Sequence, residues 1–166
     1  MSGFLKYTRK RCARTSKANM PCPYFEPDQV IPHPEHSNAR LPLIDEYQGR
    51  CRASDIPIPA PPALRFQYCN QGNSRGCCDL FPVHEARSAL RYTVARRTET
   101  TLEVVCVEEK DYAPLRWYPV QYFFENELLA PDIPDLCTRA QVLGFCRSYL
   151  ARFSDGPLTS THNAEC

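Results

Sequence analysis

Residues 69–82, with the sequence CNQGNSRGCCDLFP, hold three cysteines and two glycines in a stretch that is polar almost to its end. A buried cysteine usually packs as a small hydrophobic residue, but these cysteines are surrounded by Asn, Gln, Ser, Arg and Gly. That composition is typical of a loop. The chain has ten cysteines in 166 residues, and core packing does not explain those that lie in a polar loop.

The length and composition suit one globular domain. The chain is long enough for a single core and short for two, and its contents of 43% hydrophobic and 23% charged residues are ordinary. No stretch approaches the ~20 apolar residues of a membrane span, and Lys6 interrupts the apolar start GFLKY, so we expect no secretory signal. We therefore expect a cytoplasmic protein, in which cysteines serve as metal ligands or catalytic groups more often than as disulfides.

The two ends of the chain differ from the middle. Residues 1–20 carry six basic residues and no acidic one, although the whole chain has a net charge of +1. Because residues 1–19 show no apolar period, we expect a disordered basic arm, either a solvated tail or a contact for an anionic partner such as nucleic acid. The composition changes at Met20, which raises the hypothesis that Met20 is the true start. Residues 154–166 are expected to be a flexible tail.

The first half of the domain is expected to be irregular. Residues 21–62 contain ten of the sixteen prolines and end in IPIPAPP. Proline fixes φ and removes a backbone donor, so this segment predicts extended chain that wraps the domain, with a short polyproline II piece at its end. Residues 63–68, ALRFQY, alternate apolar and polar side chains and predict a short strand that leads into the cysteine loop.

The second half predicts regular elements. Alternating apolar residues indicate strands over 89–97, 101–109 and 115–126, with Pro119 at an edge or a bulge. Asp135 offers a cap for a helix over 136–153. Its apolar face is predicted to contain Leu136, Ala140, Leu143, Cys146, Leu150 and Phe153. The fold class is therefore α+β: an irregular Cys/Pro-rich N-terminal half, a three-stranded antiparallel meander and one C-terminal helix, forming a single metal-binding domain over residues 20–153.

Their positions sort the cysteines into groups. Cys106 lies on the apolar face of a predicted strand, and Cys137 and Cys146 lie in the helix, so all three are expected to be core residues. Cys12 and Cys166 lie in the tails. The remaining five are in the irregular half beside turn-forming residues: Cys22, Cys51, Cys69, Cys77 and Cys78.

Four of these five cysteines form the candidate metal site. Glycine and proline turns let the backbone approach a metal centre and donate N–H groups to anionic sulfurs. Adjacent side chains on an extended segment point to opposite sides, so either Cys77 or Cys78 can ligate. Cys78 is favoured because Phe81 follows it closely, as Tyr24 follows Cys22. The predicted ligands, with no catalytic residue beside them, are Cys22, Cys51, Cys69 and Cys78.

The order of these motifs resembles that of small uncharacterised bacterial proteins. The resemblance rests on CPYF, LPLIDEYQGRCRA and CNQGNSRGCCDLFP, followed by the meander and helix, and covers about residues 20–153. It implies Cys78 rather than Cys77 as the ligand and agrees with a start at Met20. It implies no activity.

The spacing of the ligands bears on the metal. The gaps are 28, 17 and 8 residues, whereas zinc sites usually use C-x2-4-C pairs. Cys22-Pro23 is similar to the Cys-Pro step of ferredoxin motifs, which favours a [4Fe–4S] cluster. The prediction is an iron–sulfur protein, not an enzyme, that acts as an electron-transfer or redox accessory subunit for a protein partner or larger complex. The alternative is a structural zinc module of an interaction protein, which contacts nucleic acid through residues 1–19.

Three other patterns are weaker. Residues 72–76 match G-x-S-x-G, but a nucleophile elbow needs a strand before Ser74 and a helix after it. His33 and His36 flank Pro34 and predict a solvated loop, with one histidine as a substitute ligand left open. His84 could pair with Cys77 as a catalytic couple, but nothing supplies the orienting group.

Overall fold

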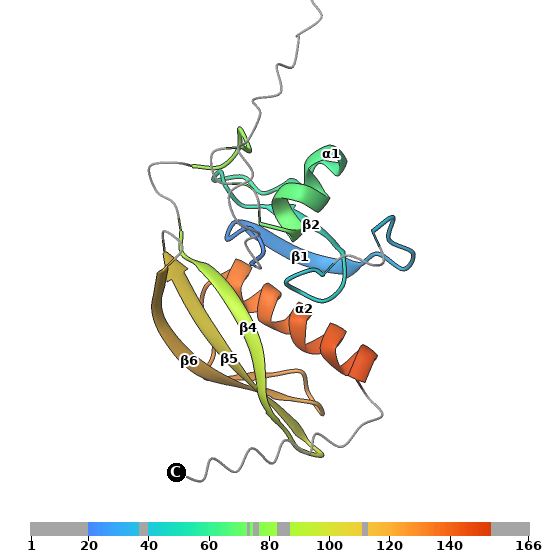
Figure 1. Cartoon of the computed structure of the whole chain (residues 1–166), viewed down its shortest axis with the longest axis vertical. Helices are drawn as coiled ribbons and strands as arrows, with labels where there is room; N and C mark the ends of the chain where they lie inside the picture. The colour runs from blue at the N-terminus through green and yellow to red at the C-terminus, as the bar shows by residue number, and fades with distance from the viewer. Residues whose placement is uncertain are drawn as a thin grey trace, which may run out of the picture.

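The computed structural model describes residues 20–36, 40–72, 74, 77–82, 87–110 and 113–153. Two antiparallel sheets flank a long helix, so the predicted α+β class is confirmed (Figure 1). The predictions for the basic arm, the C-terminal tail, Cys12, His84 and Cys166 lie outside the described residues.

The C-terminal sheet contains the predicted meander and one further strand. Its order is β4 (Ala89–Arg97), β5 (Thr101–Lys110), β6 (Ala113–Phe123) and β7 (Leu129–Ala130). The prediction of three strands was incomplete, since the two-residue β7 pairs with Gln121 and Tyr122 of β6. Pro119 lies in β6 just before the two residues that pair with β7. On that side β6 has no neighbouring strand at Pro119 in the described part of the chain, so the missing N–H costs no hydrogen bond of the sheet.

A second sheet lies in the half that was expected to be irregular. It consists of β1 (Phe25–Val30), β2 (Tyr47–Cys51) and β3 (Ile58–Pro59), in that order. The expectation of extended chain without a sheet was therefore wrong. Pro27 lies in the edge strand β1, where the pairing register shifts, and Pro59 lies in the other edge strand. The central strand β2 has no proline, so the sheet keeps the rule that proline avoids central strands.

The strand predicted over 63–68 is wrong. This segment is a short helix with a first turn α1 (Pro62–Leu64) and a π-helical continuation η1 (Arg65–Asn70). Pro62 in the first helical turn fits this assignment, because proline has no N–H to satisfy there. The buried Asn70 side chain donates to the carbonyl oxygens of Arg65 (3.2 Å) and Tyr47 (3.0 Å), and its Oδ1 accepts from the Tyr47 N–H at 2.9 Å. These bonds hold the π-helical turn against β2.

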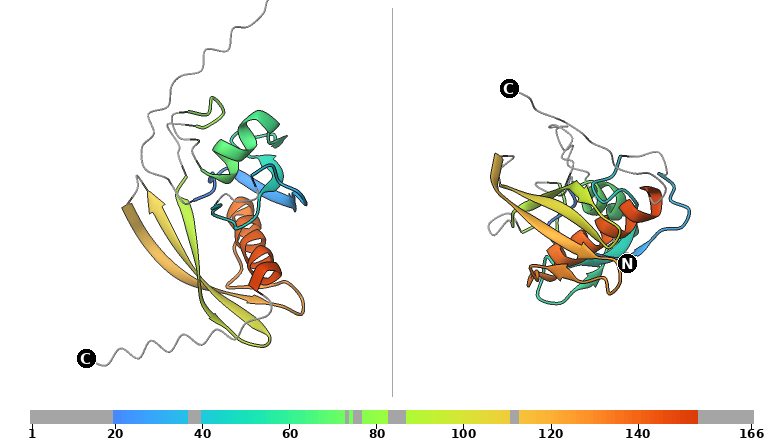
Figure 2. Two further views of the ribbon diagram at one scale, coloured as in Figure 1. Left: turned by 45° about the vertical axis from the view of Figure 1, so that its right-hand side comes forward. Right: turned by 90° about the horizontal axis from the view of Figure 1, so that it is seen from below.

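Helix α2 (Leu136–Phe153) has the predicted bounds and lies between the two sheets (Figure 2). Asp135 caps it as expected, since Asp135 Oδ1 accepts from the Thr138 N–H at 2.8 Å. Its predicted apolar face is wrong in part, because Leu136 and Phe153 are each 52% exposed. The helix is covered on two sides, and its buried residues are Cys137, Gln141, Val142, Gly144, Phe145, Cys146 and Ser148.

The prediction that Cys106, Cys137 and Cys146 are core residues is confirmed. Cys106 and Cys146 are 0% exposed and Cys137 is 1% exposed. Within the described part of the chain, no helix combines the length and apolar character that crossing a membrane requires.

Candidate metal centre

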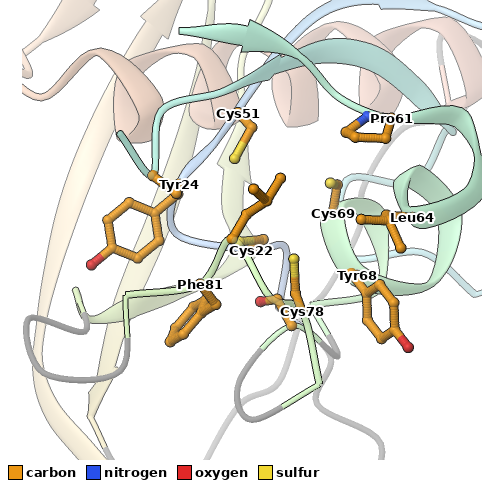
Figure 3. Close-up of a pocket in the computed structure, with 12 residues that line it drawn as sticks. Cys22, Tyr24, Cys51, Pro61, Leu64, Tyr68, Cys69, Cys78 and Phe81 are labelled. Carbon is orange, nitrogen blue, oxygen red and sulfur yellow. The ribbon is translucent and has the colours of Figure 1, made fainter. Parts of the chain in front are cut away.

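Four cysteines from distant parts of the chain line one small apolar pocket. They come from the segment before β1, the end of β2, the π-helical turn η1 and the loop that follows it: Cys22, Cys51, Cys69 and Cys78. Figure 3 shows their sulfur atoms directed into the space between them. Cys77 is not among the residues that line this pocket, although it is the neighbour of Cys78.

Main-chain bonds fix the first three cysteine segments to one another. The Cys22 N–H donates to the Cys69 carbonyl at 2.8 Å, so the segment that precedes β1 is tied directly to η1. Cys51 faces Phe25 in the β1–β2 register, and the Arg52 N–H donates to the Tyr24 carbonyl at 2.8 Å. The N-terminal sheet is therefore what brings Cys51 next to the Cys22 segment.

The Cys78 segment closes the pocket through a tight turn. The N–H groups of Cys77 and Cys78 donate to the Ser74 carbonyl at 3.2 and 2.9 Å, and the Phe81 N–H donates to the Cys78 carbonyl at 3.1 Å. Gly72 has a φ of +74°, and a Cβ there would lie 1.7 Å from the Met20 carbonyl oxygen. The loop thus packs against the start of the described chain in a way that only glycine permits.

Gln141 of α2 holds the Cys22 segment from behind. Its Nε2 donates to the carbonyl oxygens of Cys22 (2.8 Å) and Phe25 (2.7 Å), and its Oε1 accepts from the Tyr92 hydroxyl at 2.9 Å. Gln141 is 2% exposed, and every bond it makes is buried. The sequence analysis did not predict a role for Gln141 or Asn70. Asn70 does follow Cys69 directly in the cysteine loop.

The pocket disfavours ionised thiols unless a cation compensates them. Burial raises the pKa of Cys22 to about 11, and the neighbouring Cys51 and Cys78 add to the rise. Burial raises the pKa of Cys69 further, again with contributions from the other three thiols. Burial is also the main reason why the pKa of Cys78 is raised. Because thiolates are the form that binds metal, a metal centre would compensate charges that this pocket otherwise resists.

The four sulfurs surround a space rather than a single point. Among the described residues, no three His, Cys, Asp or Glu side chains converge closely enough to hold one metal ion. The walls around the sulfurs are apolar or aromatic and include Tyr24, Leu64, Tyr68 and Phe81. The arrangement thus offers soft sulfur ligands with a largely apolar surround.

The competing motifs have other surroundings in the structure. Ser74 is 2% exposed and lines the cysteine pocket, whereas a nucleophile elbow exposes its serine. His36 stacks on Phe66 with a ring separation of 3.4 Å, and its Nδ1 lies 3.3 Å from Glu46 Oε2. His36 is thus held by Phe66 and Glu46, away from the residues that line the pocket.

Comparison with family models, curated proteins and solved structures gives no significant match for this chain. The function is therefore argued from its own residues.

Proposed function

We propose that the protein binds one [4Fe–4S] cluster through Cys22, Cys51, Cys69 and Cys78 and serves as an electron-transfer or redox accessory protein. The observation that carries the proposal is that four cysteines, with gaps of 28, 17 and 8 residues between them in the chain, line the same apolar pocket. Four cysteine thiolates are the usual ligands of such a cluster. With all four irons held by protein, electron transfer is the chemistry that this set of ligands favours.

A cluster and a zinc ion need different separations of the ligand sulfurs. Zinc binds thiolates at about 2.3 Å in a tetrahedron, which brings the ligand sulfurs within about 4 Å of one another. In a cubane cluster each thiolate binds a different iron, so the cysteine sulfurs stand farther apart. Among the described residues, no group of three His, Cys, Asp or Glu side chains could hold a single metal ion, and the four cysteines share the lining of one pocket.

The exposed side of the pocket is the expected route for electrons. Cys51 and Cys78 are partly exposed, whereas Cys22 and Cys69 are buried. Leu80, which also lines the pocket, is 39% exposed. A redox partner would therefore dock on the Cys51–Cys78 side, where the path from the cluster to the surface is short.

The test is a visible absorption spectrum of anaerobically purified full-length protein, with iron, sulfide and zinc assayed on the same sample. We expect a brown protein with about four iron and four sulfide per chain, as a [4Fe–4S] centre requires. A colourless protein with one zinc per chain would replace the cluster by a structural zinc site. A protein without either metal would overturn the proposal.

A further inference from the structure

Ser74 carries a buried hydroxyl that lacks a conventional partner. The residue is 2% exposed, and its Oγ makes no hydrogen bond of ordinary geometry in the described structure. Buried polar atoms in proteins nearly always have a partner, so each exception needs an explanation. The Ser74 main chain is already used, since its carbonyl accepts from two N–H groups of the turn. The hydroxyl is therefore the polar group of Ser74 whose partner has to be explained.

The position of the hydroxyl indicates what its partner is. Ser74 lines the same pocket as the four cysteines. Its hydroxyl lies near enough to the Cys22 side chain to interact with it, and both residues face the same pocket. A hydroxyl that donates a hydrogen bond to an anionic sulfur stabilises its negative charge. Three other cysteine sulfurs also line the pocket, but Cys22 is the one whose side chain is paired with the Ser74 hydroxyl.

We propose that Ser74 donates a hydrogen bond from Oγ to the Cys22 thiolate and thereby raises the reduction potential of the bound cluster. The inference rests on the proposed [4Fe–4S] function and names a residue that tunes the centre without ligating it. Reduction by one electron adds one negative charge to the iron–sulfur core and its thiolates. A hydroxyl donor stabilises that added charge, and hydrogen bonds to sulfur are an established means by which proteins set cluster potentials.

The geometry also explains why Ser74 can act on Cys22 from a loop. The Cys77 and Cys78 N–H groups bond to its carbonyl, which fixes the backbone of the residue. Gly72 packs on Met20, two residues before Cys22. The loop that supplies Cys78 thus also places the Ser74 hydroxyl beside Cys22.

The test compares the reduction potentials of wild-type and Ser74→Ala protein, each loaded with iron and sulfide, in a titration with dithionite. We expect the variant to keep its cluster and to have a lower potential. Loss of one hydrogen bond to a charged group corresponds to roughly a tenfold smaller equilibrium constant for reduction, which is about 59 mV for a one-electron couple. Ser74→Thr, which keeps the hydroxyl, should restore most of the potential.

The matched control is Ser148→Ala. Ser148 is 1% exposed, and its Oγ lies 2.6 Å from the Tyr47 hydroxyl, so its loss also removes a buried hydroxyl. This variant should lose stability but keep the wild-type potential. A Ser74→Ala protein with four irons and the wild-type potential would overturn the role of Ser74 while leaving the cluster in place. A wild-type protein without iron would overturn both proposals.

A measurement on the wild type covers the case in which Ser74→Ala does not fold. The iron–sulfur stretching bands are recorded by resonance Raman spectroscopy after reconstitution in H2O and in D2O. A hydroxyl that donates to the Cys22 sulfur should shift the band of that iron–thiolate bond on deuteration. Bands that coincide in the two solvents would contradict the proposal without any variant.

Discussion

Cys77 and Cys78 are neighbours, yet Cys78 lines the pocket and Cys77 does not. We therefore expect Cys78→Ser to lose most of its bound iron and its visible absorption, because one of four thiolates is removed. Cys77→Ser is the matched control and should keep both. Iron assay and absorption of the two variants, prepared in parallel, measure the difference. The reverse result would move the ligand from Cys78 to Cys77.

Gly72 is the second residue on which the site depends. A side chain at its φ of +74° costs about 1–2 kcal/mol, and a Cβ would lie 1.7 Å from the Met20 carbonyl oxygen. We expect Gly72→Ala to displace the cysteine loop, so that both iron content and the free energy of unfolding fall, the latter by about 2 kcal/mol or more.

Gly144 is the control for Gly72. A Cβ on Gly144 would lie 3.3 Å from the Tyr47 ring, a much milder contact than the 1.7 Å at Gly72. Gly144→Ala should therefore keep its iron and lose less stability in urea denaturation. If Gly72→Ala loads iron as well as Gly144→Ala, the loop does not depend on this packing.

At the residue scale, the sequence pattern grouped four cysteines that line one pocket in the structure, and their role as ligands stays a prediction. The four cysteines lie among turn-forming residues in the half without a clear apolar period, whereas Cys106, Cys137 and Cys146 lie in segments predicted as a strand and a helix, and this separated the two groups. Asn70, Ser74 and Gln141 have no such signal. Asn70 and Gln141 are buried by partners more than 20 residues away in the chain, and Ser74 is buried by the pocket. A polar residue without such a partner nearby in the sequence is predicted to lie on the surface.

Helix α2 acts on the site through Gln141, which bonds to two carbonyl oxygens of the β1 segment and accepts from Tyr92 in the other sheet. Gln141→Leu would remove these three buried hydrogen bonds, although the Cys22 carbonyl keeps one from the Phe25 N–H. Each buried group left unsatisfied costs about 1–3 kcal/mol, and we expect a total loss of roughly 3 kcal/mol in the free energy of unfolding, measured by urea denaturation.

Gln121→Leu is the control for this prediction, because Gln121 is an exposed residue of β6. Its substitution should change the free energy of unfolding by a few tenths of a kcal/mol. Equal stability of the Gln141→Leu and wild-type proteins would show that α2 does not hold the Cys22 segment through this side chain.

At the scale of elements, prediction succeeded where one periodicity dominated. Strands β4 and β5 alternate cleanly, and their inward residues Leu102, Val104 and Cys106 are fully buried. Helix α2 was found, but its face was misassigned because both sheets cover it. The N-terminal sheet was missed because the density of proline hid β2, which contains none. The segment 63–68 alternates over too few residues to distinguish a strand from a helical turn.

The whole domain contains a core of neutral thiols that links its stability to pH. Burial raises the pKa of Cys106, Cys137 and Cys146 to about 12, against an ordinary value of 9.0. The folded state therefore holds these protons more tightly than the unfolded chain. Their contribution to stability is complete below pH 9 and is lost as the pH rises towards 12.

We expect the free energy of unfolding to fall above pH 9, where each such thiol contributes about 1.4 kcal/mol per pH unit. Cys106→Ala removes one of these protons, so its stability should be lower at neutral pH but should fall less steeply above pH 9. Urea denaturation of the reduced protein at successive pH values measures both slopes. Parallel slopes would mean that Cys106 ionises in the folded core as readily as in the unfolded chain, which its complete burial opposes.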